Sequence, residues 1–180
     1  MVKFHMKESF PIPPREFIER TMYRFDEYEK FAPNVTHVDV LSQEKLPDGR
    51  EEIVARVFAE GWLPPMARAW FKQEDMNWKE HYIIDFEKLE VDFRIETPMF
   101  TEYVKCSGRN FVRAKAGGCE VLMDAEMNIG LFPIKGVPTA VVRGVLNVVE
   151  PFIGKLVNLN MKNYFTNVRK CMEKEKKGAR

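Results

Sequence analysis

The side chains that most often carry catalysis or bind metals are few in this sequence, and their spacing matches no reactive motif. The three histidines, His5, His37 and His81, fit neither an HExxH pattern nor a similar metal-binding spacing. The sequence also contains no GxSxG nucleophile motif, no P-loop and no GxGxxG motif. We therefore expect no metal ion and no cofactor, and the sequence identifies no catalytic residue.

Charged and phenolic side chains in the middle of the chain are the remaining candidates for chemistry. Tyr103 combines a ring that can be buried with a hydroxyl that can anchor one polar atom of a ligand. Arg56, Glu60 and Arg68 lie on segments whose two faces are not clearly separated, so an inward one could orient a ligand headgroup. Because a buried charge must be paired or hydrogen-bonded, we expect these three to point outward.

The three cysteines, Cys106, Cys119 and Cys171, favour a reducing environment, since they are odd in number, far apart and without a CxxC pair. The first ten residues lack the apolar stretch of a signal peptide. The longest apolar run, residues 137–159, contains charged residues and a proline, which argues against a membrane-spanning segment. These features predict a cytoplasmic protein with reduced cysteines.

Length and composition indicate one folded domain. The chain has 180 residues, of which 45% are hydrophobic and 31% charged, with a formal net charge of +1. We expect a single domain over residues 1–173, followed by a charged C-terminal tail over residues 174–180. The balanced charge gives no electrostatic reason to expect a nucleic-acid partner. The oligomeric state does not follow from the sequence.

Alternation of apolar and polar residues predicts an antiparallel sheet with one buried and one wet face. The period of two is clearest over residues 2–7, 89–96 and 119–129. It also places His81 on the outer face, with parity opposite to Tyr82. The Asp-Gly pair in the turn at residues 46–49 indicates a hairpin. Further strands are expected at residues 35–42, 50–61, 67–74, 78–86 and 101–115.

Two helices are expected, at residues 14–30 and 138–173, because apolar residues recur there at spacings of three and four. On a helical wheel of residues 141–159, a polar stripe lies opposite an apolar arc about 180° wide. The polar stripe is Arg143, Asn147, Glu150, Gly154 and Asn158, and the opposite side is Val141, Val145, Phe152, Leu156 and Leu159. Such a wide arc predicts that the sheet wraps around the helix.

The second helix is long for a domain of this size. At 1.5 Å per residue it would measure about 54 Å, whereas a compact chain of this length is about 40 Å across. Pro151, with Gly154 close by, is the expected position of a kink or break that lets the two halves follow the sheet.

The order of these elements resembles the helix-grip fold of the START, birch pollen allergen and polyketide cyclase superfamily. The most specific local match is FPIPPREFIERTMYRFDEYEKFAPNVTHVDVL, residues 10–41. Here Tyr28, Phe31 and Pro33 stand where polyketide cyclase-like and coenzyme Q-binding members carry Tyr, Phe and Pro. The resemblance covers about residues 2–173. It implies an α+β fold in which a curved antiparallel sheet of six to seven strands wraps around a long C-terminal helix, with a short helix after the first strand.

The resemblance also implies a cavity for a hydrophobic small molecule such as a lipid, quinone or polyketide, between the sheet and the C-terminal helix. It carries no catalytic residue over to this chain. Inward parity and the helical wheel indicate the cavity wall. The expected ligand-binding residues are Tyr82, Phe93, Tyr103, Met123, Met127, Val145, Phe152 and Leu156.

Three alternatives remain open from the sequence. The inward side chains could simply fill the space and leave no cavity. The chain could be a cyclase or hydrolase that uses Tyr103 or Arg68 for acid–base or oxyanion chemistry. It could also be a membrane-associated or protein-interaction module. The interaction stripe would then be Val142, Leu146, Ile153 and Val157, and the loop residues that could touch a membrane are Trp62, Leu63, Leu131, Phe132 and Ile134.

Overall fold

The computed structural model describes residues 1–27, 31–32, 34–60, 76–98, 101–133 and 136–178. Several positions discussed above lie outside these ranges, namely Tyr28, Pro33, Trp62, Leu63, Arg68, Ile134 and the strand expected at residues 67–74. Within the ranges, the side chains of a few residues are also not described, namely Asp26, Val148, Val149, Phe152, Ile153, Leu156 and those of residues 176–178.

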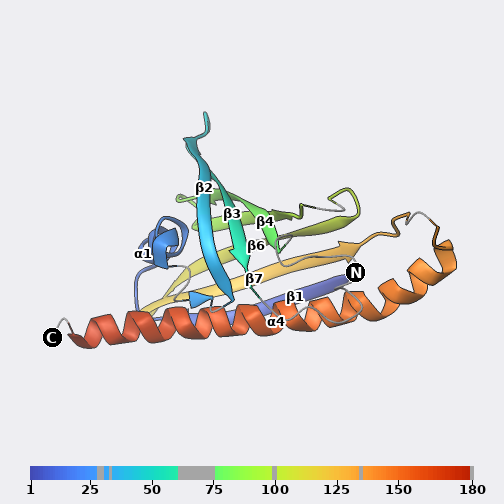
Figure 1. The fold of residues 1–180 in the computed structure, drawn as a ribbon. Helices are drawn as coiled ribbons and strands as arrows, with labels where there is room; N and C mark the ends of the chain where they lie inside the picture. Colours follow the sequence, from blue (N-terminus) through green and yellow to red (C-terminus); the bar gives the residue numbers. More distant parts are fainter. Residues whose placement is uncertain (28–30, 33, 61–75, 99–100, 134–135, 179–180) are drawn as a thin grey trace.

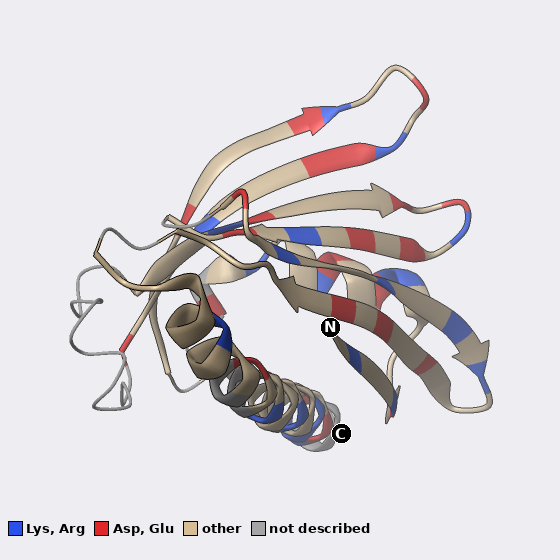
Figure 2. Ribbon diagram, turned by 90° about the vertical axis from the view of Figure 1, so that its right-hand side faces the viewer, with Lys and Arg blue, Asp and Glu red and all other residues tan. Residues whose placement is uncertain are grey.

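Seven strands form one antiparallel sheet, as the alternation predicted. Their order across the sheet is β1-β7-β6-β5-β4-β3-β2, so the first strand lies beside the last and β1 and β2 form the two edges. The sheet curves around the side on which the long C-terminal helix lies (Figures 1 and 2). The strands are β1 (Val2–Phe10), β2 (Val35–Lys45), β3 (Glu51–Ala59), β4 (Asn77–Asp85), β5 (Glu90–Glu96), β6 (Val104–Lys115) and β7 (Gly118–Ile129).

The predicted hairpin between β2 and β3 is present. Its turn is closed by the backbone N–H of Leu46, which donates to the carbonyl of Arg50 at 2.8 Å. Gly49 has a φ of 87°, a left-handed conformation that glycine adopts without strain. The Asp-Gly pair therefore fixes the register of this edge of the sheet.

The first helix is shorter than the sequence suggested. Helix α1 spans Pro14–Met22, and the N–H of Tyr23 closes its last turn on the carbonyl of Glu19. The chain then makes a short 3-10 turn, η1, over Phe25–Glu27. The expected helix over residues 14–30 was thus wrong in its end, because the buried Phe25 is reached through a separate turn and not through a continuous helix.

The second helix, α4, is continuous over Thr139–Gly178 and contains Pro151. Its 40 residues correspond to a length of about 60 Å. Pro151 does not break the helix, and Figure 1 shows its N-terminal part bending around the end of the sheet. Residues 174–178, expected as a tail, continue this helix, and Glu175 forms an ion pair with Arg20 of α1.

The face that α4 turns toward the sheet differs from the wheel prediction. Val141 is 53% exposed and Leu159 is 55% exposed, although both belong to the arc expected to be buried. Gly154, from the expected polar stripe, is buried, and a Cβ built on it would lie 2.7 Å from the side chain of Val2. The expected orientation was therefore wrong at these three positions, whereas Arg143, Asn147 and Asn158 of the polar stripe are exposed as expected.

A glycine and an ion pair explain the different orientation. Gly154 has no side chain, so the helix backbone approaches β1 closely at this point. One turn earlier, the Glu150 carboxylate lies 2.7 Å from the N-terminal amine of Met1. The interaction stripe considered above is affected as well, because Val142 is buried and Val157 packs against the core.

The C-terminal half of α4 forms the base of the core. Its buried side chains meet those of β1, β7 and α1 in one cluster. In this cluster the centroid of the Phe10 ring lies 4.5 Å from that of the Phe17 ring and 5.9 Å from that of the Phe165 ring. The buried residues of α4 here are Tyr164, Phe165, Val168 and Met172.

The outer face of the sheet is charged, as the alternation predicted. Acidic and basic residues recur along its strands (Figure 2), and many form cross-strand ion pairs. Arg109 on β6 pairs with Glu90 and Asp92 on β5. His81 lies on this face, where its ring contacts Glu96 at 3.1 Å and Arg94 at 3.1 Å. The inner face, by contrast, carries most of the buried apolar side chains of the sheet.

Candidate functional site

The inner face of the sheet is organised in rows of residues that are aligned across neighbouring strands. We name three adjacent rows after one member each. The Glu80 row is Ala55, Glu80, Ile95, Cys106, Met127 and Val2. The Tyr82 row is Ile53, Tyr82, Phe93, Gly108, Ala125 and Phe4. The Asn110 row is Glu51, Ile84, Val91, Asn110, Met123 and Met6.

Four of the predicted ligand-binding residues lie together in these rows. Tyr82 and Phe93 are direct cross-strand partners in the Tyr82 row. Met127 and Met123 flank that row from the two adjacent rows on β7. All four belong to the core cluster or pack against it, on the face that also meets α4. The structure therefore brings these four side chains to one surface.

The other four predicted residues lie elsewhere or lack a described side chain. Tyr103 precedes β6, its carbonyl accepts the N–H of Gly130 at 2.7 Å, and its ring lies 6.0 Å from that of Phe132. It therefore lies at the end of the sheet, where the chain leaves β7. Val145 is half-buried on α4, and Phe152 and Leu156 lie on the same helix with side chains that are not described.

The sequence analysis missed a buried carboxylate on the inner face. Glu80 is only 8% exposed and lies on β4 between Trp78 and Tyr82. The indole Nε1 of Trp78 donates to Glu80 Oε1 at 2.7 Å, and the Tyr82 hydroxyl donates to Glu80 Oε2. The signal that could have found it is parity, because Trp78, Glu80 and Tyr82 alternate on the same side of one strand.

The charge of Glu80 contributes to the raised pKa values of two other groups, Cys106 on β6 and Tyr164 on α4. Burial, with a smaller contribution from the nearby Glu80 carboxylate, raises the pKa of the Cys106 thiol to about 11. Burial also raises the pKa of Tyr164 on α4, again with a contribution from Glu80. Both groups therefore stay protonated at neutral pH. A neutral thiol is a poor nucleophile, so Cys106 does not provide one here, whereas the carboxylate oxygens of Glu80 accept hydrogen bonds.

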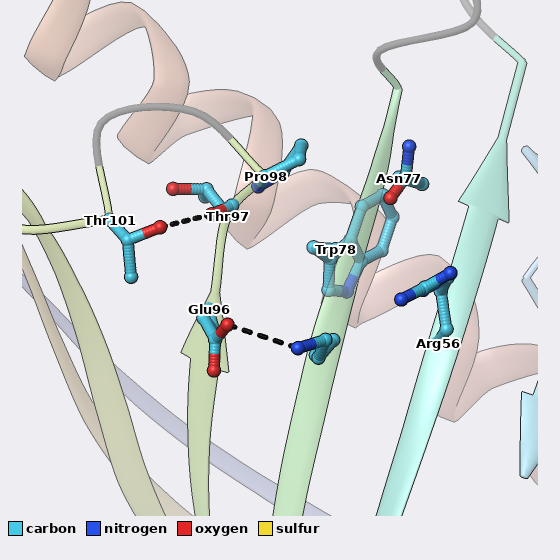
Figure 3. Close-up of a pocket in the computed structure, with 8 residues that line it drawn as sticks. Arg56, Asn77, Trp78, Glu96, Thr97, Pro98 and Thr101 are labelled. Atoms are coloured by element: carbon cyan, nitrogen blue, oxygen red, sulfur yellow. Dashed lines mark hydrogen bonds and ion pairs between the residues drawn. The ribbon is translucent and has the colours of Figure 1, made fainter. Parts of the chain in front are cut away.

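A polar pocket of about 240 Å³ lies at the ends of β3, β4 and β5 (Figure 3). An ion pair between Lys79 and Glu96, 3.3 Å apart, crosses it, and Arg56 contributes a guanidinium to its wall. Arg56 points outward as expected, because it pairs across the strands with Lys79, which shares the outer face with His81. Trp78 lines the pocket and also bonds to Glu80, so this one side chain links the pocket to the interior.

Two kinds of site are not found among the described residues. No group of three or more His, Cys, Asp or Glu side chains is arranged to hold a metal ion in the described part of the chain. No helix in that part is both long enough and apolar enough to cross a membrane.

Comparison with solved structures shows the fold. The Zhui aromatase/cyclase from Streptomyces sp. R1128 matches with a TM-score of 0.63 and 12% identity, over 95% of this chain and 93% of that one. Ara h 8.0201 matches with a TM-score of 0.60 and 15% identity, over 96% and 97% of the two chains. A START superfamily protein from Mycobacterium smegmatis matches with a TM-score of 0.56 and 11% identity, over 97% and 99%.

These likenesses confirm the helix-grip fold. They extend over nearly the whole chain, in agreement with the order of elements that suggested the resemblance. No protein-family model matches the sequence, and no curated protein matches it either. The comparisons therefore define the architecture and leave the activity to be argued from the site.

Proposed function

We propose that this protein binds a hydrophobic small molecule between the inner face of its sheet and helix α4. The observation that carries the proposal is the composition of that face, where Tyr82 and Phe93 lie next to the buried carboxylate of Glu80 and Met123 and Met127 continue the apolar surface on β7. A core that serves packing alone gains little from a buried charge, whereas ligand sites combine apolar walls with a few fixed polar groups. Methionine side chains suit such a wall because they adapt to varied apolar shapes.

The relatives in fold support the proposal. An aromatase/cyclase and a START superfamily protein share this architecture over nearly their whole length. A lipid, a quinone or a polyketide is the ligand class that we propose for this chain. The interior of a helix-grip protein is the place where such a compound would be shielded from water.

Native mass spectrometry of protein purified from cells, followed by solvent extraction, tests this function. We expect a bound apolar compound in the natural protein and in Leu159→Gln, because Leu159 is exposed on the outer side of α4. The Met127→Gln variant has nearly the same size but places an amide on the inner face, and should carry much less of the compound. A natural protein that carries no compound and does not bind the hydrophobic dye Nile red would contradict the proposal.

A second candidate function is catalysis of cyclase or hydrolase type on the same fold. The observation that favours it is Glu80, whose carboxylate is buried and held by Trp78 and Tyr82 in fixed orientation. A carboxylate in such surroundings can act as a general base. Incubating the extracted compound with natural protein and with Glu80→Gln tests this, because only the natural protein should form a product while both retain the compound.

A further inference from the structure

A second polar group lies on the inner face, in the middle of β6. Asn110 is aligned with Val91 on β5 and with Met123 on β7. Both of these neighbours are buried, and so is Ile84, the next member of the row. The amide of Asn110 is therefore surrounded by apolar side chains on the sheet.

The Oδ1 atom of Asn110 is buried and has no hydrogen-bond partner among the described residues. Buried polar atoms in folded proteins almost always have a partner, because an unpaired one loses its bond to water without replacement. An apolar side chain of the same shape would avoid this penalty. Asn110 therefore lowers the stability of the folded protein relative to an apolar residue, and residues that lower stability are often kept because function needs them.

The neighbours of this amide are residues that we expect to touch the ligand. Met123 is its direct partner on β7. Two residues earlier on β6, Gly108 lies under the ring of Phe93, since a Cβ built on Gly108 would be 2.7 Å from the Phe93 Cζ. Because residues two apart on a strand share one face, Asn110 lies beside this ring.

We propose that Asn110 is a specificity-determining residue whose Oδ1 accepts a hydrogen bond from a hydroxyl or N–H group of the ligand. This inference rests on the proposed function and narrows the ligand to an apolar molecule that carries a hydrogen-bond donor. A hydroxyl suits the amide best, since it can donate to Oδ1 and also accept from Nδ2. A ligand hydroxyl would give Asn110 Oδ1 a hydrogen-bond partner. Among the described residues, this is the one buried side-chain oxygen that lacks a partner.

A matched pair of probes tests the inference. Naphthol and methylnaphthalene substituted at the same ring position have nearly the same shape, but only naphthol donates a hydrogen bond. Their dissociation constants are measured by fluorescence for the natural protein, Asn110→Leu and the control Asn128→Leu, whose asparagine is exposed on the outer side of β7. We expect Asn110→Leu to lower the preference for naphthol about tenfold and Asn128→Leu to leave it unchanged.

Thermal unfolding of the empty proteins provides the second readout. If the Asn110 amide serves to bind a ligand, the Asn110→Leu variant should melt at the same temperature as the natural protein or higher. If Asn110→Leu does not fold, both measurements are made on Asn110→Val instead. An unchanged probe preference, with a lower melting temperature, would overturn the inference and indicate that Asn110 holds a structural water. Failure of both probes to bind would overturn the proposed function as well.

Discussion

Glu80 places a carboxylate in an interior that is otherwise mostly apolar, and both of its described hydrogen bonds come from its own strand. Trp78 and Tyr82 donate to its two oxygens from the neighbouring positions on the same face of β4. These two hydrogen bonds orient the carboxylate from within β4.

The influence of Glu80 on Cys106 gives a prediction at the scale of single residues. Because the carboxylate contributes to the raised pKa of this thiol, Glu80→Gln should lower that pKa, although burial will keep it above the ordinary value. We expect Cys106 to be alkylated faster at mildly alkaline pH, because a larger fraction of the thiol is then ionised. Peptide mapping by mass spectrometry measures this rate.

The control for this experiment is Glu126→Gln, which removes the same charge from an exposed position on the outer side of β7. The alkylation rate of Cys106 should remain unchanged in this variant. An equal increase in both variants would show that the effect comes from the net charge of the protein, and the assigned role of Glu80 would be wrong.

The raised pKa values of the cysteines also predict how stability depends on pH. Burial raises the pKa of Cys106 and of Cys119 to about 11, from an ordinary value of 9.0. Between these values the unfolded chain releases protons that the folded protein keeps, so the free energy of unfolding falls as the pH rises. With allowance for partial exposure to solvent, we expect a loss of about 1–2 kcal/mol for Cys106.

Urea unfolding at neutral pH and at a pH near 11 measures this loss. The Cys106→Val, Cys119→Val double variant lacks both thiols and should show a flatter decline over the same range. A decline of equal steepness in the double variant would assign the alkaline instability to other groups, such as Tyr23, whose pKa is also raised by burial and by its bond to Glu51.

At the scale of elements, the contact between α4 and β1 depends on one glycine. A Cβ at Gly154 would lie 2.7 Å from the Val2 side chain, whereas a Cβ at Gly144 on the same helix would meet no atom within 4 Å. Alanine is favoured over glycine inside a helix by about 1 kcal/mol. At Gly144 a substitution by alanine changes helix propensity alone, whereas at Gly154 it also changes the packing against β1.

We predict opposite effects of the same substitution at these two glycines. Gly144→Ala should raise the free energy of unfolding by about 0.5–1 kcal/mol, because it adds helix propensity without a clash. Gly154→Ala should lower it by about 1 kcal/mol, because the helix must move away from β1. Urea unfolding measures both, and Val2→Ala should partly restore stability in the Gly154→Ala background. Stabilisation by both substitutions would refute the close approach.

The strands could be predicted from the sequence, and the orientation of the long helix could not. The alternation of apolar and polar residues predicted β5 and β7, because successive side chains of a strand point to opposite faces and only one face of this sheet is buried. The wheel correctly placed Arg143, Asn147 and Asn158 in solvent but misplaced Gly154 and Glu150, because it counts glycine and glutamate as facing solvent. Gly154 allows a close approach, and Glu150 is stabilised near the sheet by the N-terminal amine, and neither contact is visible in a hydrophobic pattern.

The candidate site, too, could be predicted from the sequence only in part. Tyr82, Phe93, Met123 and Met127 were predicted because their parity places them on the inner face. Glu80 was missed although it shares the parity of Tyr82, because a charged residue is assumed to face water unless a partner is known. Its partners, Trp78 and Tyr82, become apparent only when the strand is seen in three dimensions.

At the scale of the whole molecule, the curved sheet and α4 enclose an interior whose floor is formed by the three rows of the inner face. The C-terminal half of α4 closes this interior at one end through Tyr164, Phe165 and Val168. Trp78, whose indole donates to the buried Glu80, also lines the polar pocket at the ends of β3, β4 and β5 (Figure 3). A ligand held in this interior would contact the sheet and the helix at once, and should therefore stabilise the whole fold.

The most direct test of ligand binding in this interior is an NMR titration of protein with methyl-labelled methionine, using methylnaphthalene as the probe. Met123 and Met127 lie on the inner face, while Met1 is exposed. Single methionine-to-leucine substitutions assign the three signals. We predict that the Met123 and Met127 signals shift and saturate together, while the Met1 signal does not move. Shifts confined to exposed methionines, or none at any concentration of the probe, would contradict binding between the sheet and α4.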